Sequence, residues 1–438
     1  MKFRAFVDTV QGLRFLLEEL PLSSGASWRY LLDDSIPEEE EAITERYGRL
    51  DYFLQFDGMR HQLLTKHLSC VHDISNTLFH LQKGKILDDI ELYEIKHLSY
   101  VSIKIAETLP DYNICDISIS QKAFDILDPY KNRQDSFYIY DIYDEQLAKF
   151  RKDNDIDAAL REEQKVLSQL SERLRPLATG LMAILNALFI IDVTQAKAVL
   201  FRKYHFTHPV FKKENRLKVR GMFNPYVRTK VGEQAYQSID ICLHKGVPAF
   251  LIGMNMGGKT VTLNTLVLLQ LLAQTGFGCP AEEIETELCP LICGFSADNI
   301  EKNDGYSSFA NELFALDEMI KKTEKASKAG CTSLIVIDEP ARTTNPTEGA
   351  ALVQGLVDTL RNSEVFLMVA THYNVHTEQC AFLRVKGLTK EGIDYHIEEV
   401  GTAEVPNEAI AVAELINVSE QWINNSKHYL PNAQQGWY

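Results

Sequence analysis

The sequence predicts a helical N-terminal region followed by an α/β domain with a mostly parallel sheet, in a chain of 438 residues. Apolar residues recur at helical spacing through much of the first half, whereas the second half alternates short apolar runs with helical segments. Strands that alternate with helices are typical of a parallel sheet, because a crossover helix must return the chain between parallel strands. We therefore expect a helical core and lever domain over residues 1–220 and an α/β domain over 221–438.

Two apolar stripes define the expected helical region. The first runs from Phe3 to Leu20, and the second runs from Ile156 to Ile191 with an interruption at Pro176. The most apolar part of the second stripe, residues 177–191, is shorter than the roughly 20 residues that cross a bilayer, so we expect a buried helix and no membrane association. Between the stripes, residues 137–141 alternate weakly and predict a short strand.

The second half contains three apolar runs with the length of strands buried on both faces. These runs are Val247–Ile252, Leu334–Ile337 and Val365–Ala370. Segments with helical periodicity separate them: Thr260–Thr275, Ser308–Ala326 and Gly349–Asn362. This order predicts that the carboxyl ends of the three strands meet at one edge of a sheet, where α/β proteins bind ligands.

Charge divides the chain unevenly. Acidic residues outnumber basic ones by 61 to 45, so the summed field disfavours phosphate backbones. Residues 202–230 are the exception, with nine Lys or Arg and one acid, and they form either a solvated surface or a contact for phosphate or an acidic partner. The eight cysteines include no CxxC pair, and no signal-peptide pattern opens the sequence, so we expect reduced thiols and a cytoplasmic protein.

Residues 253–260 match the pattern GxxxxGK[ST] between an apolar strand and a helix, which is the context that a phosphate-binding loop requires. Backbone N–H groups of such a loop close on phosphates at the helix N-terminus. Lys259 is then expected to bridge the β- and γ-phosphates of ATP, and the Thr260 hydroxyl to ligate Mg²⁺. The residues predicted to bind nucleotide here are Gly253, Asn255, Met256, Gly257, Gly258, Lys259, Thr260 and Val261.

Catalytic side chains are expected at the ends of the two later strands. Asp338 and Glu339 follow the run at 334–337, where Asp338 suits the Mg²⁺ shell and Glu339 suits a general base for the attacking water. His372 follows the run at 365–370 and is expected to sense or stabilise the γ-phosphate.

These residues carry a resemblance to the ATPase domain of the MutS family, which is a P-loop domain of the ABC type. The string at 255–260, the Asp338-Glu339 pair and the Thr-His of 371–372 match that family in order. Residues 304–309, Asp-Gly-Tyr-Ser-Ser-Phe, resemble its signature loop, which implies that Ser307 or Ser308 reaches the nucleotide of the opposite subunit. An adenine-stacking aromatic is expected before the loop strand, and Tyr236 is the candidate.

The resemblance implies a dimer, of this chain or with a MutS-like paralogue, that uses ATP and Mg²⁺ as a conformational switch. It also implies that residues 408–413 with Leu415 form a closing helical segment used for dimer contact. The family's mismatch-reading and clamp modules are not visible: no Phe has Glu two positions later, and residues 141–175 leave no room for a clamp. Two partners stay open. The first is duplex DNA, held by the basic stretch in repair or recombination. The second, which we favour, is a protein client, because shortened MutS-like ATPases reactivate adenosylcobalamin-dependent aminomutases.

Overall fold

The computed structural model describes residues 2–112, 114–253, 258–296, 307–375, 379–389, 392–401, 410, 413–414 and 418–428. The chain divides into two compact units, each described here by itself. We call the first the sheet unit, which contains Met1–Glu19, Ser35–Tyr47 and Leu200–Tyr438. The second is the helical unit, which contains Leu20–Asp34 and Gly48–Val199. The domain boundary expected at residue 220 remains a prediction.

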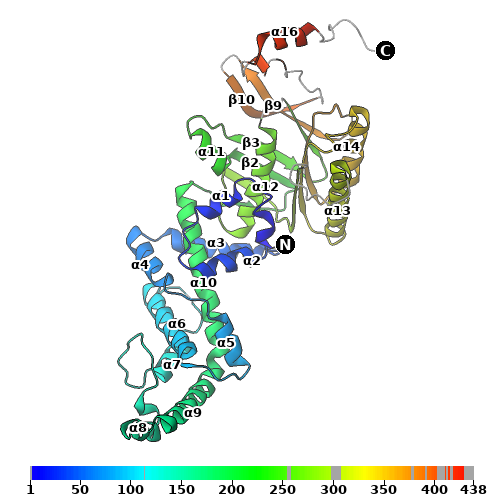
Figure 1. Ribbon diagram of the computed structural model, residues 1–438. Helices are drawn as coiled ribbons and strands as arrows, with labels where there is room; N and C mark the ends of the chain where they lie inside the picture. The colour runs from blue at the N-terminus through cyan, green and yellow to red at the C-terminus, as the bar shows by residue number, and fades with distance from the viewer. Residues whose placement is uncertain are drawn as a thin grey trace. The chain divides into compact units, whose positions relative to one another are not determined.

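The helical unit is built from helices, as expected (Figure 1). They are α2 (Gly25–Asp33), α4 (Gly58–Leu68), α5 (Ser75–Gln82), α6 (Asp89–Thr108), α7 (Ser118–Leu127), η2 (Asp141–Tyr143), α8 (Glu145–Lys152), α9 (Ile156–Leu174), η3 (Arg175–Leu177), and parts of α3 (Glu40–Leu54) and α10 (Ala178–Lys203). The 3₁₀ turn η3 lies where Pro176 interrupts the apolar stripe, since proline lacks the N–H that an α-helix uses.

Helix α10 continues through Asp192, which is only 1% exposed. Its carboxylate accepts hydrogen bonds from the backbone N–H groups of Ser23 and Ser24, each at 3.0 Å, so the buried charge is satisfied. By length and composition, one helical stretch, residues 156–203, qualifies as a candidate membrane span. This is weak evidence, because 56% of its most apolar window is buried in the structure, as in an ordinary core helix.

Residues 137–141 form no strand, contrary to the prediction from their alternation. Their aromatic rings instead pack on one another: the Tyr140 ring contacts those of Tyr130, Tyr138 and Tyr143, and Tyr140 is buried. The alternation of these residues therefore reflects ring packing rather than pairing with a neighbouring strand.

The sheet unit contains two sheets. The smaller has the order β1-β5-β2-β3 and is formed by β1 (Val210–Phe211), β2 (Arg216–Met222), β3 (Ile239–His244) and β5 (Glu283–Thr286). The larger has the order β10-β9-β4-β8-β7-β6 and is formed by β4 (Ala249–Ile252), β6 (Leu291–Ser296), β7 (Ser333–Asp338), β8 (Val365–Ala370), β9 (Ala381–Thr389) and β10 (Gly392–Val400). Its strands are parallel except β10, which runs antiparallel to β9. The predicted mostly parallel sheet is thus confirmed.

Helices cover both faces of the larger sheet (Figure 1). On one face, α13 (Ser308–Lys328) and α14 (Pro346–Leu360) pack over a buried cluster that includes Ile335 and Ile337 of β7. Since side chains alternate along a strand, Leu334 and Val336 point to the other face, where α12 (Lys259–Thr275) contacts β6, β7 and β8. The unit also contains α11 (Pro225–Val231) and α16 (Glu420–His428).

The first apolar stripe is not one helix, contrary to the prediction. It forms the 3₁₀ turn η1 (Phe3–Phe6) and the short helix α1 (Leu13–Glu18), separated at Gly12, whose φ of 92° is left-handed. A Cβ at Gly12 would lie 2.9 Å from the Asn224 Oδ1, so the left-handed turn and its close approach to that side chain both favour glycine. Phe3 stacks on Phe277 with ring centroids 5.8 Å apart, which places this segment in the core of the sheet unit.

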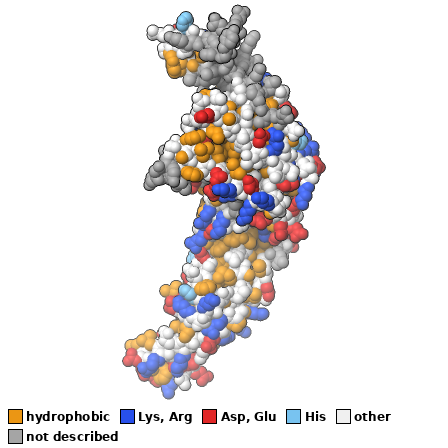
Figure 2. Space-filling model, turned by 90° about the vertical axis from the view of Figure 1, so that its right-hand side faces the viewer, with side chains coloured by type: hydrophobic (Ala, Val, Ile, Leu, Met, Phe, Trp, Pro, Cys, Tyr) orange, Lys and Arg blue, Asp and Glu red, His pale blue; other side chains and the backbone are white. Residues whose placement is uncertain are grey.

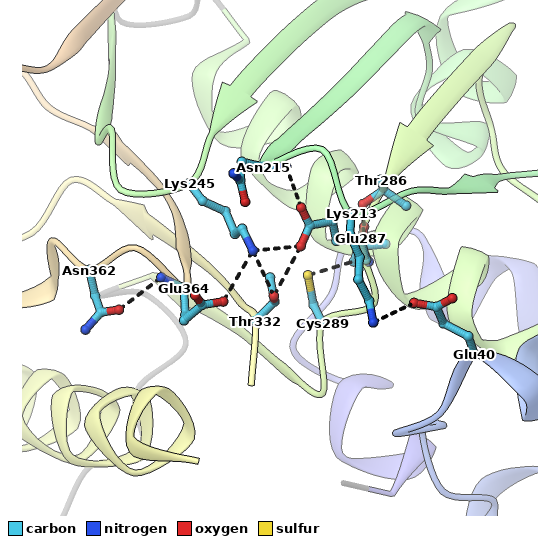
Figure 3. A network of polar contacts seen from close by, with 11 residues as sticks. Glu40, Lys213, Asn215, Lys245, Thr286, Glu287, Cys289, Thr332, Asn362 and Glu364 are labelled. Carbon is cyan, nitrogen blue, oxygen red and sulfur yellow. Dashed lines mark hydrogen bonds and ion pairs between the residues drawn. The ribbon is translucent and has the colours of Figure 1, made fainter. Parts of the chain in front are cut away.

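A buried ionic network joins the two sheets at the amino ends of β7 and β8 (Figure 3). The Lys245 ammonium lies 2.8 Å from the Glu287 carboxylate and 3.3 Å from that of Glu364. Glu287 also accepts hydrogen bonds from the backbone N–H of Asn215 at 2.6 Å and from the Thr332 hydroxyl at 3.3 Å. This network holds the amino ends of β7 and β8 in place. Asp338 and His372 are found at the other, carboxyl ends of these strands.

Candidate nucleotide site

The predicted phosphate loop connects the buried strand β4 to the N-terminus of α12. Gly258 caps the helix in a left-handed conformation with φ of 79°, which glycine adopts without strain. Lys259 and Thr260 form the first turn, with Lys259 buried and the Thr260 side chain exposed. The predicted residues Asn255, Met256 and Gly257 lie outside the described residues.

Lys259 reaches from α12 to the end of β7. Its ammonium donates to the carbonyl oxygen of Gly253 at 2.9 Å and lies 3.9 Å from the Glu339 carboxylate, although the side chain is only 5% exposed. Burial lowers the pKa of Lys259, while the carboxylates of Glu339 and Asp338 act in the opposite direction. The structure therefore brings the loop lysine and the acid pair together, as the sequence predicts.

His372 belongs to the same cluster. Burial lowers its pKa, the Glu339 carboxylate opposes that shift, and the positive charges of Lys259 and Arg342 reinforce it. The lowered pKa favours the neutral imidazole at pH 7. The parallel pairing of β7 with β8 explains the convergence, because Asp338 pairs with Ala370 and Glu339 donates its backbone N–H to the Ala370 carbonyl at 3.0 Å.

A side cavity of about 290 Å³ opens beside the helix N-terminus. Its lining includes Gly258 and Val261 of α12, together with Tyr236, Gln237 and Tyr395. Tyr236 is therefore brought to the predicted site, and its hydroxyl oxygen accepts the backbone N–H of Asn224 at 2.8 Å, which fixes the ring. Burial raises the pKa of Tyr236, so the phenol stays neutral.

Ser307 and Ser308 are exposed at the start of α13, where Ser307 caps the helix by accepting the Ala310 N–H at 3.1 Å. Within the described part of the chain, no hydrogen bond or ion pair joins either serine to Lys259, Asp338 or Glu339. Their predicted role involves the site of a second subunit and stays a prediction.

The residues present fit a magnesium-bound nucleoside triphosphate. A helix N-terminus and a buried ammonium favour phosphate oxygens. The Asp338 carboxylate and the Thr260 hydroxyl are hard oxygen donors, which Mg²⁺ accepts alongside substrate phosphates. Among the described residues no group of three or more His, Cys, Asp or Glu could hold a metal ion.

Sequence reasoning named Arg342 only as a match to the family, without a role, and missed Tyr395 and Gln237. Arg342 lies 3.6 Å from the Glu339 carboxylate, and its signal was a basic residue three positions after the acid. Tyr395 and Gln237 were not identifiable, because β10 follows α12 by more than a hundred residues and nothing local links them. Gln237 bonds to β10: its side-chain oxygen accepts the Tyr395 N–H at 2.8 Å, and its side-chain amide donates to the Ile393 carbonyl at 3.2 Å.

Comparison with known proteins agrees with this geometry. Residues 249–432 match the family model for MutS domain V, so this part of the chain is a MutS-type ATPase domain. Homology extends to proteins named Endonuclease MutS2. The chain is 31% identical to that of Lactobacillus helveticus over 225 residues, which are 51% of this chain and 27% of the relative. It is 34% identical to that of Thermus thermophilus over 216 residues, 49% of this chain and 27% of the relative.

A longer match, to Endonuclease MutS2 of Lactobacillus gasseri, is 26% identical over 370 residues, 82% of this chain and 43% of the relative. The homology is therefore distant, and the chain spans less than half the length of these relatives.

Proposed function

We propose that this protein, whose residues 249–432 form a MutS-type ATPase domain, is a dimeric switch that uses ATP hydrolysis to remodel a protein client. The observation that supports ATP hydrolysis best is the convergence of Lys259, Glu339 and His372 from three separate elements. An adenosylcobalamin-dependent aminomutase is the client that the sequence resemblance suggests. The eight cysteines, none of which forms a disulfide, suit the reducing cytoplasm, where we place the protein.

The residues have separable roles in this proposal. Lys259 holds the β- and γ-phosphates, and Thr260 with Asp338 holds Mg²⁺, which neutralises charge on the phosphates. Glu339 orients the attacking water and accepts its proton, since its carboxylate is part exposed at the edge of the cluster. The neutral imidazole of His372 hydrogen-bonds to the γ-phosphoryl group or to the water.

We propose a second copy of the chain, or a paralogue, as the dimer partner. A groove of about 790 Å³ lies between α13 and α14. These helices expose Leu313, Phe314 and Leu352, and hydrophobic side chains gather on this side of the unit in Figure 2. Because α13 begins at the exposed Ser307 and Ser308, a subunit that meets those serines would also reach this apolar surface.

A protein client is favoured over DNA because the basic stretch 202–230 is largely neutralised within the unit. Six of its nine basic side chains lie in ion pairs: Lys203–Glu19, Lys212–Glu285, Lys213–Glu40, Arg216–Glu285, Arg220–Glu283 and Arg228–Glu233. Such exposed pairs add little stability, but their carboxylates reduce the local positive field that would attract phosphates.

Duplex DNA is the second candidate partner, and the observation for it is that the relatives are named endonucleases. The two candidates differ in the salt dependence of binding. A DNA-binding surface that neutralises several phosphates loses affinity steeply as salt rises.

The test measures ATP turnover and binding with three additions: none, duplex DNA, and a purified aminomutase holoenzyme inactivated by turnover. We expect basal hydrolysis, no DNA binding even at low salt, and ATP-dependent recovery of the aminomutase. Salt-sensitive, ATP-dependent DNA binding without recovery would establish the DNA candidate instead. The absence of any ATP hydrolysis by the wild-type protein would refute the proposed function.

A further inference from the structure

The turn that carries Glu339 has a strained backbone. Glu339 has φ of 45° and Ala341 has φ of 61°, and neither residue is a glycine. Side chains disfavour this left-handed region, so such conformations persist only where neighbouring contacts fix them. The position of the Glu339 carboxylate therefore depends on whatever holds this turn.

Two buried side chains hold it through both polar groups of Ala341. The Glu312 carboxylate accepts the Ala341 N–H at 2.6 Å, and the Tyr373 hydroxyl donates to the Ala341 carbonyl at 2.6 Å. Glu312 is 2% exposed and Tyr373 is 5% exposed, so water does not replace either bond. Burial, with the nearby charges of Glu312 and Glu339, raises the pKa of Tyr373, so its hydroxyl keeps the proton that it donates.

The surrounding packing is shaped for the Tyr373 hydroxyl. A Cβ at Gly349 would lie 2.4 Å from that oxygen, so glycine at this position of α14 leaves the space in which the hydroxyl sits. Tyr373 also donates its backbone N–H to the Thr371 hydroxyl at 3.0 Å, and its ring lies 4.1 Å from that of His372, centroid to centroid. The same residue thus contacts both the catalytic turn and the predicted γ-phosphate sensor.

Glu312 connects the turn to a different element, the helix α13. It lies in the first turns of α13, the helix that Ser307 caps. Its bond to Ala341 therefore ties the start of α13 to the turn that follows β7. Any displacement of α13 relative to β7 would act on the strained turn through this one hydrogen bond.

We infer that Glu312 and Tyr373 are positioning residues that hold Glu339 in its working conformation by clamping the N–H and carbonyl of Ala341. This inference rests on the proposed ATPase function. Neither residue touches the triphosphate in the inferred arrangement, so both act on the rate of hydrolysis and not on nucleotide affinity.

The experiment compares turnover and nucleotide affinity for Glu312→Ala and Tyr373→Phe with the wild type. A misplaced base costs up to about 100-fold in rate, so we expect kcat to fall by about 10- to 100-fold with Kd for ATP within about twofold of wild type. Glu312→Gln should retain most activity, because its amide oxygen can still accept the Ala341 N–H. Glu318→Ala on the exposed side of α13 and Tyr130→Phe in the helical unit are matched controls expected to leave kcat unchanged.

A double-mutant cycle with Glu339→Gln separates positioning from general loss of structure. If Glu312 acts through Glu339, Glu312→Ala should slow single-turnover hydrolysis no further in the Glu339→Gln background. Full additivity of the two losses, or wild-type turnover by both Glu312→Ala and Tyr373→Phe, would overturn the inference while leaving the proposed function intact. An inactive wild-type protein would instead overturn the proposed function itself.

Discussion

Two buried lysines at opposite edges of the larger sheet make different use of carboxylates. Lys245 is 8% exposed and lies 2.8 and 3.3 Å from its two carboxylates, whereas Lys259 is 5% exposed and lies 3.9 Å from that of Glu339. Burial disfavours the ammonium at both places. At Lys245 the hydrogen bonds that its ammonium donates to Glu287 and Glu364 outweigh burial and raise the pKa, but at Lys259 burial prevails and the pKa is lowered.

Burial alone therefore does not distinguish a structural lysine from a functional one. The short bonds of Lys245 satisfy its charge within the protein, so its network serves to hold the two sheets together. At Lys259 the printed carboxylate contact is longer, 3.9 Å to Glu339, and a phosphate bound at the helix N-terminus would add negative charge beside the ammonium.

Removing the Glu339 carboxylate from the candidate nucleotide site should give the largest effect. Glu339→Ala is expected to lower ATP turnover by about 100- to 10,000-fold, because general-base assistance is lost. Nucleotide binding should persist and the closed state should accumulate, as measured by single-turnover hydrolysis and ATP-dependent dimerisation. Glu324→Ala on the exposed face of α13 is the control, and wild-type turnover by Glu339→Ala would remove this residue from the mechanism.

Removing the Lys245 ion pairs at the other edge of the sheet should lower stability instead. Lys245→Met leaves the Glu287 carboxylate buried without its cation, which typically costs about 3–5 kcal/mol. We expect that loss in the free energy of unfolding from denaturant titration, with kcat of the folded protein little changed. Replacing Glu287 by Gln in the same protein should recover part of the loss; a Lys245→Met protein as stable as wild type would contradict the assignment.

Removing the buried lysine of the candidate nucleotide site, Lys259, should leave the fold intact. Lys259→Ala removes a charged contact to phosphate, so nucleotide affinity is expected to fall by about 10- to 100-fold or more. Titration calorimetry with a non-hydrolysable ATP analogue measures this fall, and thermal unfolding without nucleotide should show no destabilisation. Unchanged affinity would mean that this lysine does not contact the triphosphate.

The smallest expected effect concerns pH. Because its pKa is raised, Lys245 stabilises the fold fully below its ordinary value of 10.5 and loses that contribution as pH rises through the folded pKa. Lys259 has the opposite sign: between its lowered pKa and 10.5 the unfolded chain binds more protons, so stability rises with pH. Lys259→Met should therefore be more stable than wild type at pH 7, and this gain should disappear above pH 10.5. Denaturant titrations at several pH values test this, and a gain that does not shrink with pH would contradict it.

The larger sheet was predictable where strands are buried on both faces. The run Val365–Ala370 is β8 residue for residue, and the runs at 247–252 and 334–337 lie within two residues of β4 and β7. The smaller sheet and the β9–β10 hairpin were not predicted, because charged residues interrupt the apolar residues of their strands, so that no continuous apolar run marks them.

The residues of the candidate site were predictable where they follow buried parallel strands. Parallel pairing dictates that residues following β4, β7 and β8 meet at one edge, which is why Lys259, Asp338, Glu339 and His372 converge. The contribution of Tyr395 was not predictable, because it arrives on the antiparallel strand at the far side of the sheet. The left-handed turn at Ala341 likewise has no local sequence signal such as glycine.

The packing of the N-terminal segment on α12 has a consequence for how the protein is made. Phe3 stacks on Phe277, a Cβ at Gly12 would lie 3.4 Å from a methyl group of Leu268, and the Tyr47 hydroxyl donates to the Ala273 carbonyl. These early residues are synthesised long before α12, so during translation their apolar side chains have no packing partner until α12 has been made. A fragment restricted to residues 221–438 would lack this cover and expose apolar surface of α12, and it would therefore be prone to aggregate.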